Sequence, residues 1–263
     1  MFDVQVIGGG KMGEALLGGL LATGWTTTER AIVVEPSADR RAELSEGYPG
    51  LLVQAIPESG VDTILAVKPN IVLDVAEQLG ILGPRRVLSV AAGVKIADFE
   101  AVLPAGTPVI RAIPNTPALV GLGAAAVAGG TSATTADVAW ASEVLSSVGI
   151  VEVVEEVDID AVTGLSGSGP AYVFLLAEAM IAAGQQVGLS ESTSVALVNQ
   201  TLLGAATLLT ESGDSAAVLR RNVTSPNGTT AAGLAVFGDH DFGALVAEVV
   251  QAARDRSVEL GDS

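Results

Sequence analysis

The chain has 263 residues, which is enough for one large domain or two modest ones that each bury a core. It has no cysteine, so disulfides, thiolate nucleophiles and cysteine-bound metals are excluded. Its single histidine, His240, lies in a polar stretch typical of a solvated loop, and we expect no metal site. With 13 basic against 30 acidic residues, the net charge of -17 disfavours nucleic acid and anionic membranes as partners.

The residues from Val4 to Gly13 are typical of a dinucleotide-binding turn, because a β-branched run leads into glycines and then into an apolar-periodic helix. We expect Gly8 to let the chain leave the strand sharply and Gly10 to leave room for a pyrophosphate at the backbone. Gly13 would let the helix pack close to the sheet. The alternative is a plain glycine-rich turn without a ligand.

The first half of the chain alternates strand and helix patterns. Further strands are expected at 31–34, 62–67, 86–90, 109–113 and 123–128. Helices are expected at 11–22, 37–46, from about 70 to 79, 97–103 and 135–148. Such alternation predicts a parallel sheet covered on both faces, with ligands bound beyond the carboxyl ends of its strands. Three further loops should lie there: 66–69, 89–93, which includes Ala91 and Gly93, and 113–117.

Polar residues near the turn should determine whether NAD or NADP is preferred. An acid at the end of the second strand hydrogen-bonds the ribose 2′-OH of NAD, whereas arginine or small hydroxyl residues hold the 2′-phosphate of NADP. Glu35 is placed for NAD, yet Ser37, Arg40 and Arg41 are near enough to hold a phosphate if Glu35 turns away. The choice between NADPH and NADH stays open. Lys11 is either a solvated lysine or a charge over the pyrophosphate.

From about Asp158 the β-branched patterns give way to long helical runs, which predicts a first domain at 1–157 and a second at 158–263. Helices are expected at 170–187, 190–209, 215–221, 229–237 and 241–260. Residues 171–183 and 195–209 are almost uncharged, and such helices are buried in a core, in an oligomer or in a bilayer. Gln185 and Gln186 end the first apolar stretch, Asn199 and Gln200 interrupt the second, and neither has basic flanks, which disfavours a membrane span. The sequence therefore predicts an α/β protein with an all-α second domain that forms a homodimer.

The shortage of proton donors bears on the chemistry. Reduction of a ketone or aldehyde normally needs a Tyr, Lys or His near the developing alkoxide. The only lysines are Lys11, Lys68 and Lys95, all in the first domain, and the only tyrosines are Tyr48 and Tyr172. An imine can be protonated before it is reduced, so the second domain's composition favours reduction of a C=N bond.

One loop of the second domain, at 223–231, has the composition of a small-anion site. It supplies hydroxyls, an Asn-Gly pair that permits positive φ, and a helix start with free N–H groups. The predicted substrate-binding residues are Ser225, Asn227, Gly228, Thr229 and Thr230. The alternative is an ordinary helix N-cap. A second stretch, at 164–172, also puts small residues before a helix, where the alternative is close backbone packing.

Five motifs, taken in their order and spacing, resemble those of pyrroline-5-carboxylate reductases. They lie at residues 7–13, 66–69, 113–117, 166–172 and 223–230, and the resemblance covers nearly the whole chain. It implies a Rossmann domain followed by a helical domain that interlocks with its twin, often within larger rings of dimers. It also implies reduction of 1-pyrroline-5-carboxylate to L-proline with NADPH or NADH, the last step of proline biosynthesis.

The resemblance also assigns residues. It gives these to the cofactor: Gly8, Gly10, Met12, Gly13, Val67, Lys68, Pro69 and, beside the nicotinamide, Asn115. It places Thr230 against the ring nitrogen of the substrate, and we predict Ser225 and Thr230 as the catalytic pair. Three departures from the family pattern are Lys11 for a small polar residue, Asn227 for a glycine, and Gly238 for a polar or charged residue.

Two other functions are compatible with the architecture. A β-hydroxyacid dehydrogenase would use a lysine in the helical domain, but no lysine follows Lys95. A non-catalytic nucleotide-binding module would keep the glycines but has no need of the anion-holding loop. The first residues carry no pattern of a signal peptide, so we expect a cytoplasmic protein.

Overall fold

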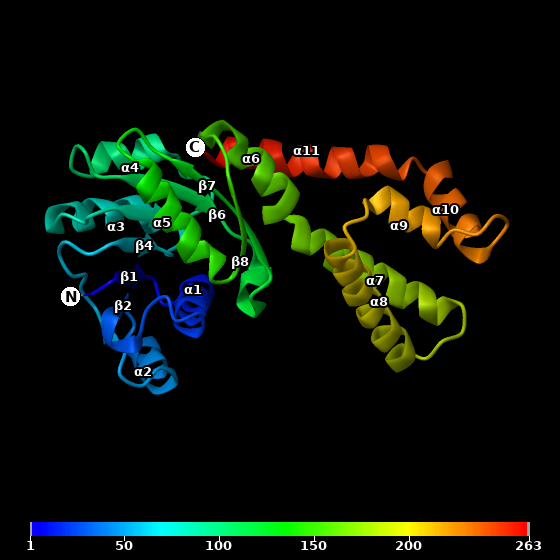
Figure 1. Ribbon diagram of the computed structural model, residues 1–263, viewed down its shortest axis with the longest axis horizontal. Helices are drawn as coiled ribbons and strands as arrows, with labels where there is room; N and C mark the ends of the chain where they lie inside the picture. The colour runs from blue at the N-terminus through cyan, green and yellow to red at the C-terminus, as the bar shows by residue number, and fades with distance from the viewer. Residues whose placement is uncertain (1, 262–263) are drawn as a thin grey trace. The chain divides into compact units, whose positions relative to one another are not determined.

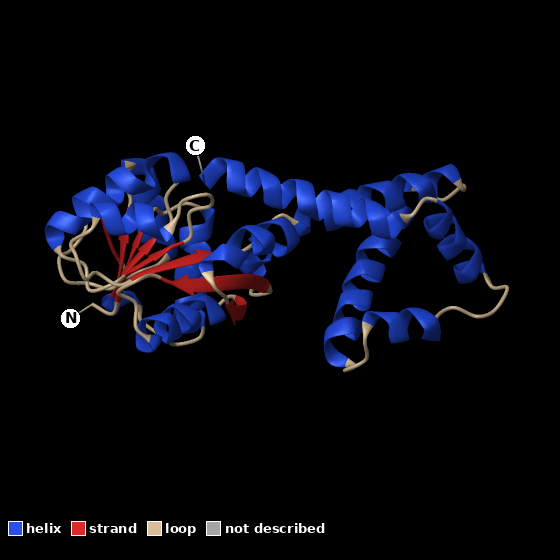
Figure 2. Cartoon of the chain, turned by 90° about the horizontal axis from the view of Figure 1, so that it is seen from above, coloured by secondary structure: helices blue, strands red, loops and turns tan. Residues whose placement is uncertain are grey.

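The computed structural model describes residues 2–261 (Figure 1). The described chain forms two compact units, one made of residues 2–168 and 251–261 and the other of residues 169–250. The strands gather in one sheet flanked by helices in the first unit, and the second unit is helical (Figure 2). The fold class predicted from the sequence, a Rossmann-type sheet followed by a helical region, is confirmed. The domain limit at 157/158 stays a prediction.

The first unit holds a single eight-stranded sheet in the order β3-β2-β1-β4-β5-β6-β7-β8. Its strands are β1 (Val4–Ile7), β2 (Ala31–Val34), β3 (Leu52–Gln54), β4 (Thr63–Leu65), β5 (Val87–Ser89), β6 (Val109–Ile113), β7 (Gly123–Gly129) and β8 (Gly149–Val153). All neighbours run parallel except β6 and β7, which are antiparallel. The predicted parallel sheet therefore contains one antiparallel pair, which the alternation of strands and helices did not indicate. A parallel crossover needs about a dozen residues or more, and only residues 114–122 join these two strands.

The helices of this unit begin and end where local sequence signals place them. They are α1 (Lys11–Ala22), α2 (Ala38–Gly47), α3 (Pro69–Leu82), α4 (Ile96–Val102), α5 (Thr135–Ser146) and α6 (Ile159–Val162), with short 3-10 turns η1 (Thr28–Arg30), η2 (Thr116–Val120) and η3 (Glu156–Asp158) and a π-helical turn η4 (Thr163–Gly167). Ser37 caps α2, and α3 starts on a proline and ends at the left-handed Gly83. Thr134 and Asp137 form a capping box on α5.

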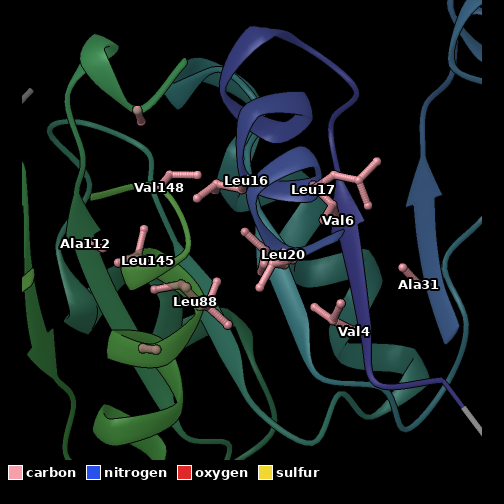
Figure 3. Packing of buried hydrophobic residues seen from close by; sticks show 14 of the residues in the cluster. Val4, Val6, Leu16, Leu17, Leu20, Ala31, Leu88, Ala112, Leu145 and Val148 are labelled. Atoms are coloured by element: carbon pink, nitrogen blue, oxygen red, sulfur yellow. The ribbon is translucent and has the colours of Figure 1, made fainter. Parts of the chain in front are cut away.

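Two apolar clusters cover the two faces of the sheet, because successive strand residues point to opposite sides. Val4, Val6 and Val33 belong to the cluster that packs under α1 and α5. Ile32 and Val34, the alternate residues of β2, belong to the cluster under α3 and α4. Figure 3 shows Leu17 of α1 beside Val6 of β1, and Leu16 on the side of Val148. Both faces are buried, as the continuous β-branched strands indicate.

A charged cluster fixes the amino-terminal edge of the sheet. Asp62, directly before β4, pairs with Arg85 at 3.0 Å and Arg86 at 2.8 Å. Arg86 also reaches Asp137 of α5 at 3.3 Å and lies 4.5 Å from the centre of the Trp140 ring. These residues lie at the edge opposite the carboxyl ends of the strands, so we assign them to stability.

The second unit is built on α7 (Gly169–Gln186) and α8 (Glu191–Glu211), followed by α9 (Ala216–Asn222), α10 (Thr229–Asp239) and the first part of α11 (Phe242–Gly261). A Cβ added at Gly184 would lie 2.7 Å from Ser194 Oγ, so α7 and α8 approach closely there. Large apolar side chains remain exposed on the single chain, among them Phe174, Leu175, Leu197 and Leu203. By length and composition alone, the segments 156–186 and 191–211 could also span a membrane.

Candidate functional site

The glycine turn after β1 has the conformation that a bound pyrophosphate requires. Gly8 has a φ of +105°, and its backbone lies so close to β4 that an added Cβ would be 2.7 Å from the Ala66 oxygen. A Cβ at Gly13 would lie 2.0 Å from the Gly8 oxygen, so only glycine lets α1 approach the strand this closely. At Gly10, by contrast, a Cβ would have no atom within 4 Å. The turn thus leaves open space in front of the amino end of α1, where an anion is favoured.

The loops predicted to hold the cofactor follow neighbouring parallel strands. Ile7 pairs with Leu65, Leu65 with Ser89, and Ser89 with Arg111, so β1, β4, β5 and β6 end at one edge of the sheet. The strand order reverses between β1 and β4, and such a switch point is where open α/β sheets bind ligands. The residues that these loops bring to that edge are Gly8, Val67, Lys68, Pro69, Ala91, Gly93 and Asn115.

These side chains differ in what they can offer a ligand. Lys11 and Lys68 are exposed, and Lys68 is the N-cap residue of α3. Met12 packs partly against the apolar cluster under α1. Ala91 is 2% exposed and donates its N–H to Ser89 Oγ at 3.3 Å, so it could contribute only backbone. Gly93, with a φ of +76°, packs against Leu260, to whose Cβ an added Cβ would come within 3.3 Å.

The Asn115 side chain forms two hydrogen bonds within the protein. Its side chain donates from Nδ2 to the Ser166 carbonyl at 3.0 Å and accepts at Oδ1 from the Ala124 N–H at 2.9 Å. The amide therefore joins the loop after β6 to the π-helical turn η4 and to β7. Sequence reasoning missed this role, because Ser166 lies 51 residues away along the chain and no local pattern reports the pairing. The placement of Asn115 beside a nicotinamide stays a prediction.

Glu35 follows β2 and faces the glycine turn. One carboxylate oxygen accepts from the Gly9 N–H at 3.0 Å, and the other accepts from the Ser37 N–H at 2.9 Å. Two backbone donors thus hold the side chain toward the turn. This position, directly after the second strand, is the one where NAD-binding turns carry an acid. The role of Glu35 as that acid stays a prediction.

Arg40 and Arg41, which could have held a phosphate, are both engaged. Arg40 Nε donates to the Gly9 carbonyl at 2.8 Å, while its two terminal nitrogens pair with Glu14 and Glu43. Hydrogen bonds to Glu43 and Glu14 raise the pKa of Arg40 above its ordinary value. Arg41 donates to the carbonyls of Glu35 at 2.9 Å and of Pro36 at 2.7 Å. Sequence reasoning missed both glutamates, although the spacing of Arg40 and Glu43 on a helix was a usable signal.

The predicted substrate loop joins α9 to α10 in the second unit. The Gly228 N–H donates to the Ser225 carbonyl at 3.0 Å, and Asn227 has a φ of +60°. With proline at 226, this is the pattern of a type II turn. Asparagine tolerates the left-handed conformation better than most residues, so Asn227 adopts the backbone that a glycine would.

The turn leaves polar groups free at the start of α10. The helical ladder opens with Ala232 N to Gly228 O at 3.1 Å, so the N–H groups before Ala232 lie outside it. Thr229 and Thr230 are exposed, and within the described chain neither hydroxyl bonds to another residue. At the other end of α10, Gly238 lies in the last turn and His240 is the exposed C-cap. Among residues 2–261, no group of three or more His, Asp or Glu side chains could hold a metal ion.

Comparison with known proteins places both parts of the chain. Residues 156–260 match the family model described as pyrroline-5-carboxylate reductase dimerisation, and residues 3–93 match that described as NADP oxidoreductase coenzyme F420-dependent. The pyrroline-5-carboxylate reductase of Pseudomonas aeruginosa is 40% identical over 98% of this chain and 97% of its own length. That of Mycobacterium tuberculosis is 40% identical over 99% and 97%.

Solved structures agree with these relatives. A pyrroline-5-carboxylate reductase from Coxiella burnetii superposes with a TM-score of 0.91 at 32% identity, covering 100% of this chain and 99% of the other. The Plasmodium falciparum pyrroline carboxylate reductase, solved with NADP bound, gives 0.83 at 28% identity, covering 99% and 98%. Because likeness to the reductases extends over almost every residue in sequence and in fold, this chain belongs to the pyrroline-5-carboxylate reductase family.

Proposed function

We propose that the chain reduces 1-pyrroline-5-carboxylate to L-proline with NADPH or NADH, as the last step of proline biosynthesis. The observation that carries this proposal is its 40% identity to reductases of that name over nearly the full length of both chains. A nicotinamide cofactor, when bound, supplies the hydride that the imine carbon gains, and the ring nitrogen gains one proton. The β-hydroxyacid dehydrogenase alternative lacks its lysine, because no lysine follows Lys95.

The cofactor is proposed to bind at the carboxyl edge of the sheet. The open space at Gly10, which a side chain would fill, suits a pyrophosphate beside the first turn of α1. Lys11 and Lys68 are exposed cations near two of these loops and would balance the phosphate charge. Glu35 and Ser37 flank the ribose position, and the loops that carry Val67, Pro69, Ala91, Gly93 and Asn115 enclose the remainder.

The substrate is proposed to bind at the start of α10. Its carboxylate would accept from the free N–H groups there, as anions do at helix N-termini. The hydroxyls of Ser225, Thr229 and Thr230 would complete the site, with Asn227 and Gly228 shaping the turn. Thr230, as the residue against the ring nitrogen, would orient the imine and hold its proton, with Ser225 beside it as the second catalytic residue. A positioned hydrogen bond of this kind needs no strongly basic side chain.

The assembly is proposed to be a homodimer through the helical region, with a ring of dimers as a larger form. Residues 156–260 match the dimerisation model, and they contain both apolar segments that could otherwise span a membrane. Burial between subunits therefore accounts for these helices without a bilayer. With the net charge of -17, this supports a cytoplasmic enzyme that binds neither membranes nor nucleic acid.

The activity is tested by initial rates with NADH and NADPH on 1-pyrroline-5-carboxylate, beside a six-membered cyclic imine and a panel of β-hydroxyacids. We expect the five-membered imine to be reduced fastest and the product to be L-proline by chiral amino-acid analysis. Oxidation of a hydroxyacid without reduction of any cyclic imine would overturn the proposal.

A further inference from the structure

The charges around the β2–α2 junction form a closed arrangement that the proposed function does not use. Three glutamates, Glu14, Glu35 and Glu43, stand around Arg40 and the glycine turn. Arg40 is anchored at all three of its guanidinium nitrogens, by the Gly9 carbonyl, Glu43 and Glu14. Its planar group has five N–H donors, and the three anchors fix its orientation.

If the Glu35 side chain rotated away from the turn, it would lose two hydrogen bonds to backbone N–H groups. Its two oxygens satisfy the N–H groups of Gly9 and Ser37 at 3.0 and 2.9 Å, and Gly9 is buried. Leaving a buried N–H without an acceptor costs about 1–3 kcal/mol. A second lone pair on each oxygen remains, so Glu35 can still accept a hydrogen bond from a ribose hydroxyl. An ionised carboxylate has no hydrogen-bond donor, so Glu35 cannot bind a phosphate.

We infer that this chain selects NADH over NADPH, with Glu35 as the acceptor at the ribose 2′ position and the pair Glu14 and Glu43 withholding Arg40 from a 2′-phosphate. The inference rests on the proposed function and concerns its cofactor. A 2′-phosphate would bring up to two negative charges beside the Glu35 carboxylate. The Arg40 guanidinium, which could neutralise them, is already bound by two other carboxylates, Glu14 and Glu43. Selectivity therefore combines an attractive acceptor for one cofactor with repulsion of the other.

Arg41 does not change this balance. Its bonds to the carbonyls of Glu35 and Pro36 stiffen the strand-to-helix connection that carries Glu35. It thereby fixes the backbone on which the acid stands. Because both of these bonds go to backbone carbonyls, Arg41 is held by the connection itself and not by a carboxylate side chain.

The test compares kcat/KM for NADH and NADPH in the parent and in two variants. The parent should favour NADH by about tenfold or more, as expected when an acid occupies the 2′ position. The double variant Glu14→Gln, Glu43→Gln keeps the side-chain shapes and releases Arg40. In this variant kcat/KM for NADPH should rise, so the ratio of kcat/KM for NADH to that for NADPH should fall by about tenfold. Glu35→Ser should lower the ratio at least as far.

A matched control lies in α11, where Arg256 and Glu259 form an i,i+3 pair at 2.7 Å that resembles the Arg40–Glu43 pair at 2.8 Å. Glu259→Gln removes a carboxylate of the same kind in the same geometry, away from the glycine turn. It should leave the cofactor ratio within about threefold of the parent's, which is roughly 0.65 kcal/mol. A shift as large as that of the double variant would mean that overall charge, not the lock on Arg40, sets the preference.

A second readout does not depend on turnover. The fluorescence of reduced nicotinamide gives a Kd for NADH and for NADPH in the absence of substrate. In the parent the Kd for NADH should be lower than the Kd for NADPH, just as kcat/KM should be higher for NADH. A parent that binds NADPH as tightly as NADH, or a double variant whose ratio stays within threefold, would overturn the inference. If cofactor selectivity is seen but no imine is reduced, the proposed reaction fails and the inference stands.

Discussion

At the scale of single residues, Thr230 carries the sharpest mechanistic prediction. Its hydroxyl is exposed in the first turn of α10 and bonds to no other residue in the described chain. Thr230→Val keeps the shape and removes that one contact. A hydrogen bond made mainly in the transition state should cost about 10- to 1000-fold in kcat, whereas lost ground-state binding appears in KM.

Thr229→Val is the neighbouring comparison, because Thr229 is proposed to hold the carboxylate rather than the ring nitrogen. It should raise KM more than it lowers kcat. The NADH Kd, measured by fluorescence, should not move in either variant, since the glycine turn is untouched. If Thr230→Val retains both kcat and KM of the parent, the proton is held elsewhere, with an already protonated imine as the remaining explanation.

Residues whose role depends on local backbone could be predicted from the sequence, and residues whose partners are distant could not. The conformations of Gly8 and Gly13 follow from a strand that must turn into a helix within a few residues. The left-handed Asn227 follows from its place before a glycine. The two bonds of Asn115 and the contact of Glu14 with Arg40 arise only when separate elements fold together. The sequence holds no local record of them.

At the scale of elements, the pairing of β7 with β8 depends on two facing glycines. A Cβ at Gly149 would lie 2.0 Å from the Gly123 oxygen, which no side-chain movement can relieve. Gly149→Ala should therefore destabilise the protein by about 3 kcal/mol or more, as overpacking against fixed backbone does. The measurement is the urea midpoint, with Gly47→Ala as control, because a Cβ at Gly47 meets no atom within 4 Å. Equal midpoints for both variants would mean that the strands can separate without cost.

The capping box of α5 gives a pH-dependent prediction. Burial raises the pKa of Asp137, but hydrogen bonds from Thr134 and the charge of Arg86 outweigh it and hold the pKa below its ordinary 3.8. A depressed folded-state pKa contributes stability that is present above 3.8 and is lost as pH falls through the folded value. The gap in free energy of unfolding between the parent and Asp137→Asn should therefore close in acid below that value.

Urea unfolding at a series of pH values down to the acid limit measures that gap. Glu46→Gln is the control, since Glu46 is exposed and forms no ion pair among the described residues. A gap for Asp137→Asn that stays constant with pH would show that the lost contact is not ionic.

The elements that the sequence pattern predicts least well are the strands at the two edges of the sheet. The strongly periodic segments, such as α1 and β6, agree with the predicted residues. Strands β3 and β8 were missed, because β3 has three residues at one edge of the sheet and β8 lies at the other with Ile150 and Val153 exposed. Edge strands are covered on fewer sides and so carry a weaker apolar pattern. Strand β7 runs antiparallel to β6 because the segment 114–122 is too short for a parallel crossover. The alternation of strand and helix patterns does not indicate this.

At the scale of the whole molecule, the apolar surface of α7 and α8 predicts an obligate dimer. Phe174, Leu175 and Leu203 are 63, 65 and 57% exposed on the single chain, too large a patch for a soluble monomer. Sedimentation at micromolar concentration should show no monomer. Phe174→Glu should release one or lower the yield of folded protein, whereas Ile81→Glu, at an exposed position of α3, should not. A parent that sediments as a stable monomer would contradict this.

Because the faces of α7 and α8 are exposed on the single chain, the melting temperature should depend on protein concentration. If two chains must meet to cover these faces, folding is a second-order event, and unfolding yields two molecules from one. Each tenfold dilution then removes about 1.4 kcal/mol from the paired state at 25 °C. The melting temperature should rise steadily as the sample is concentrated, and a dilute preparation should lose activity on standing sooner than a concentrated one.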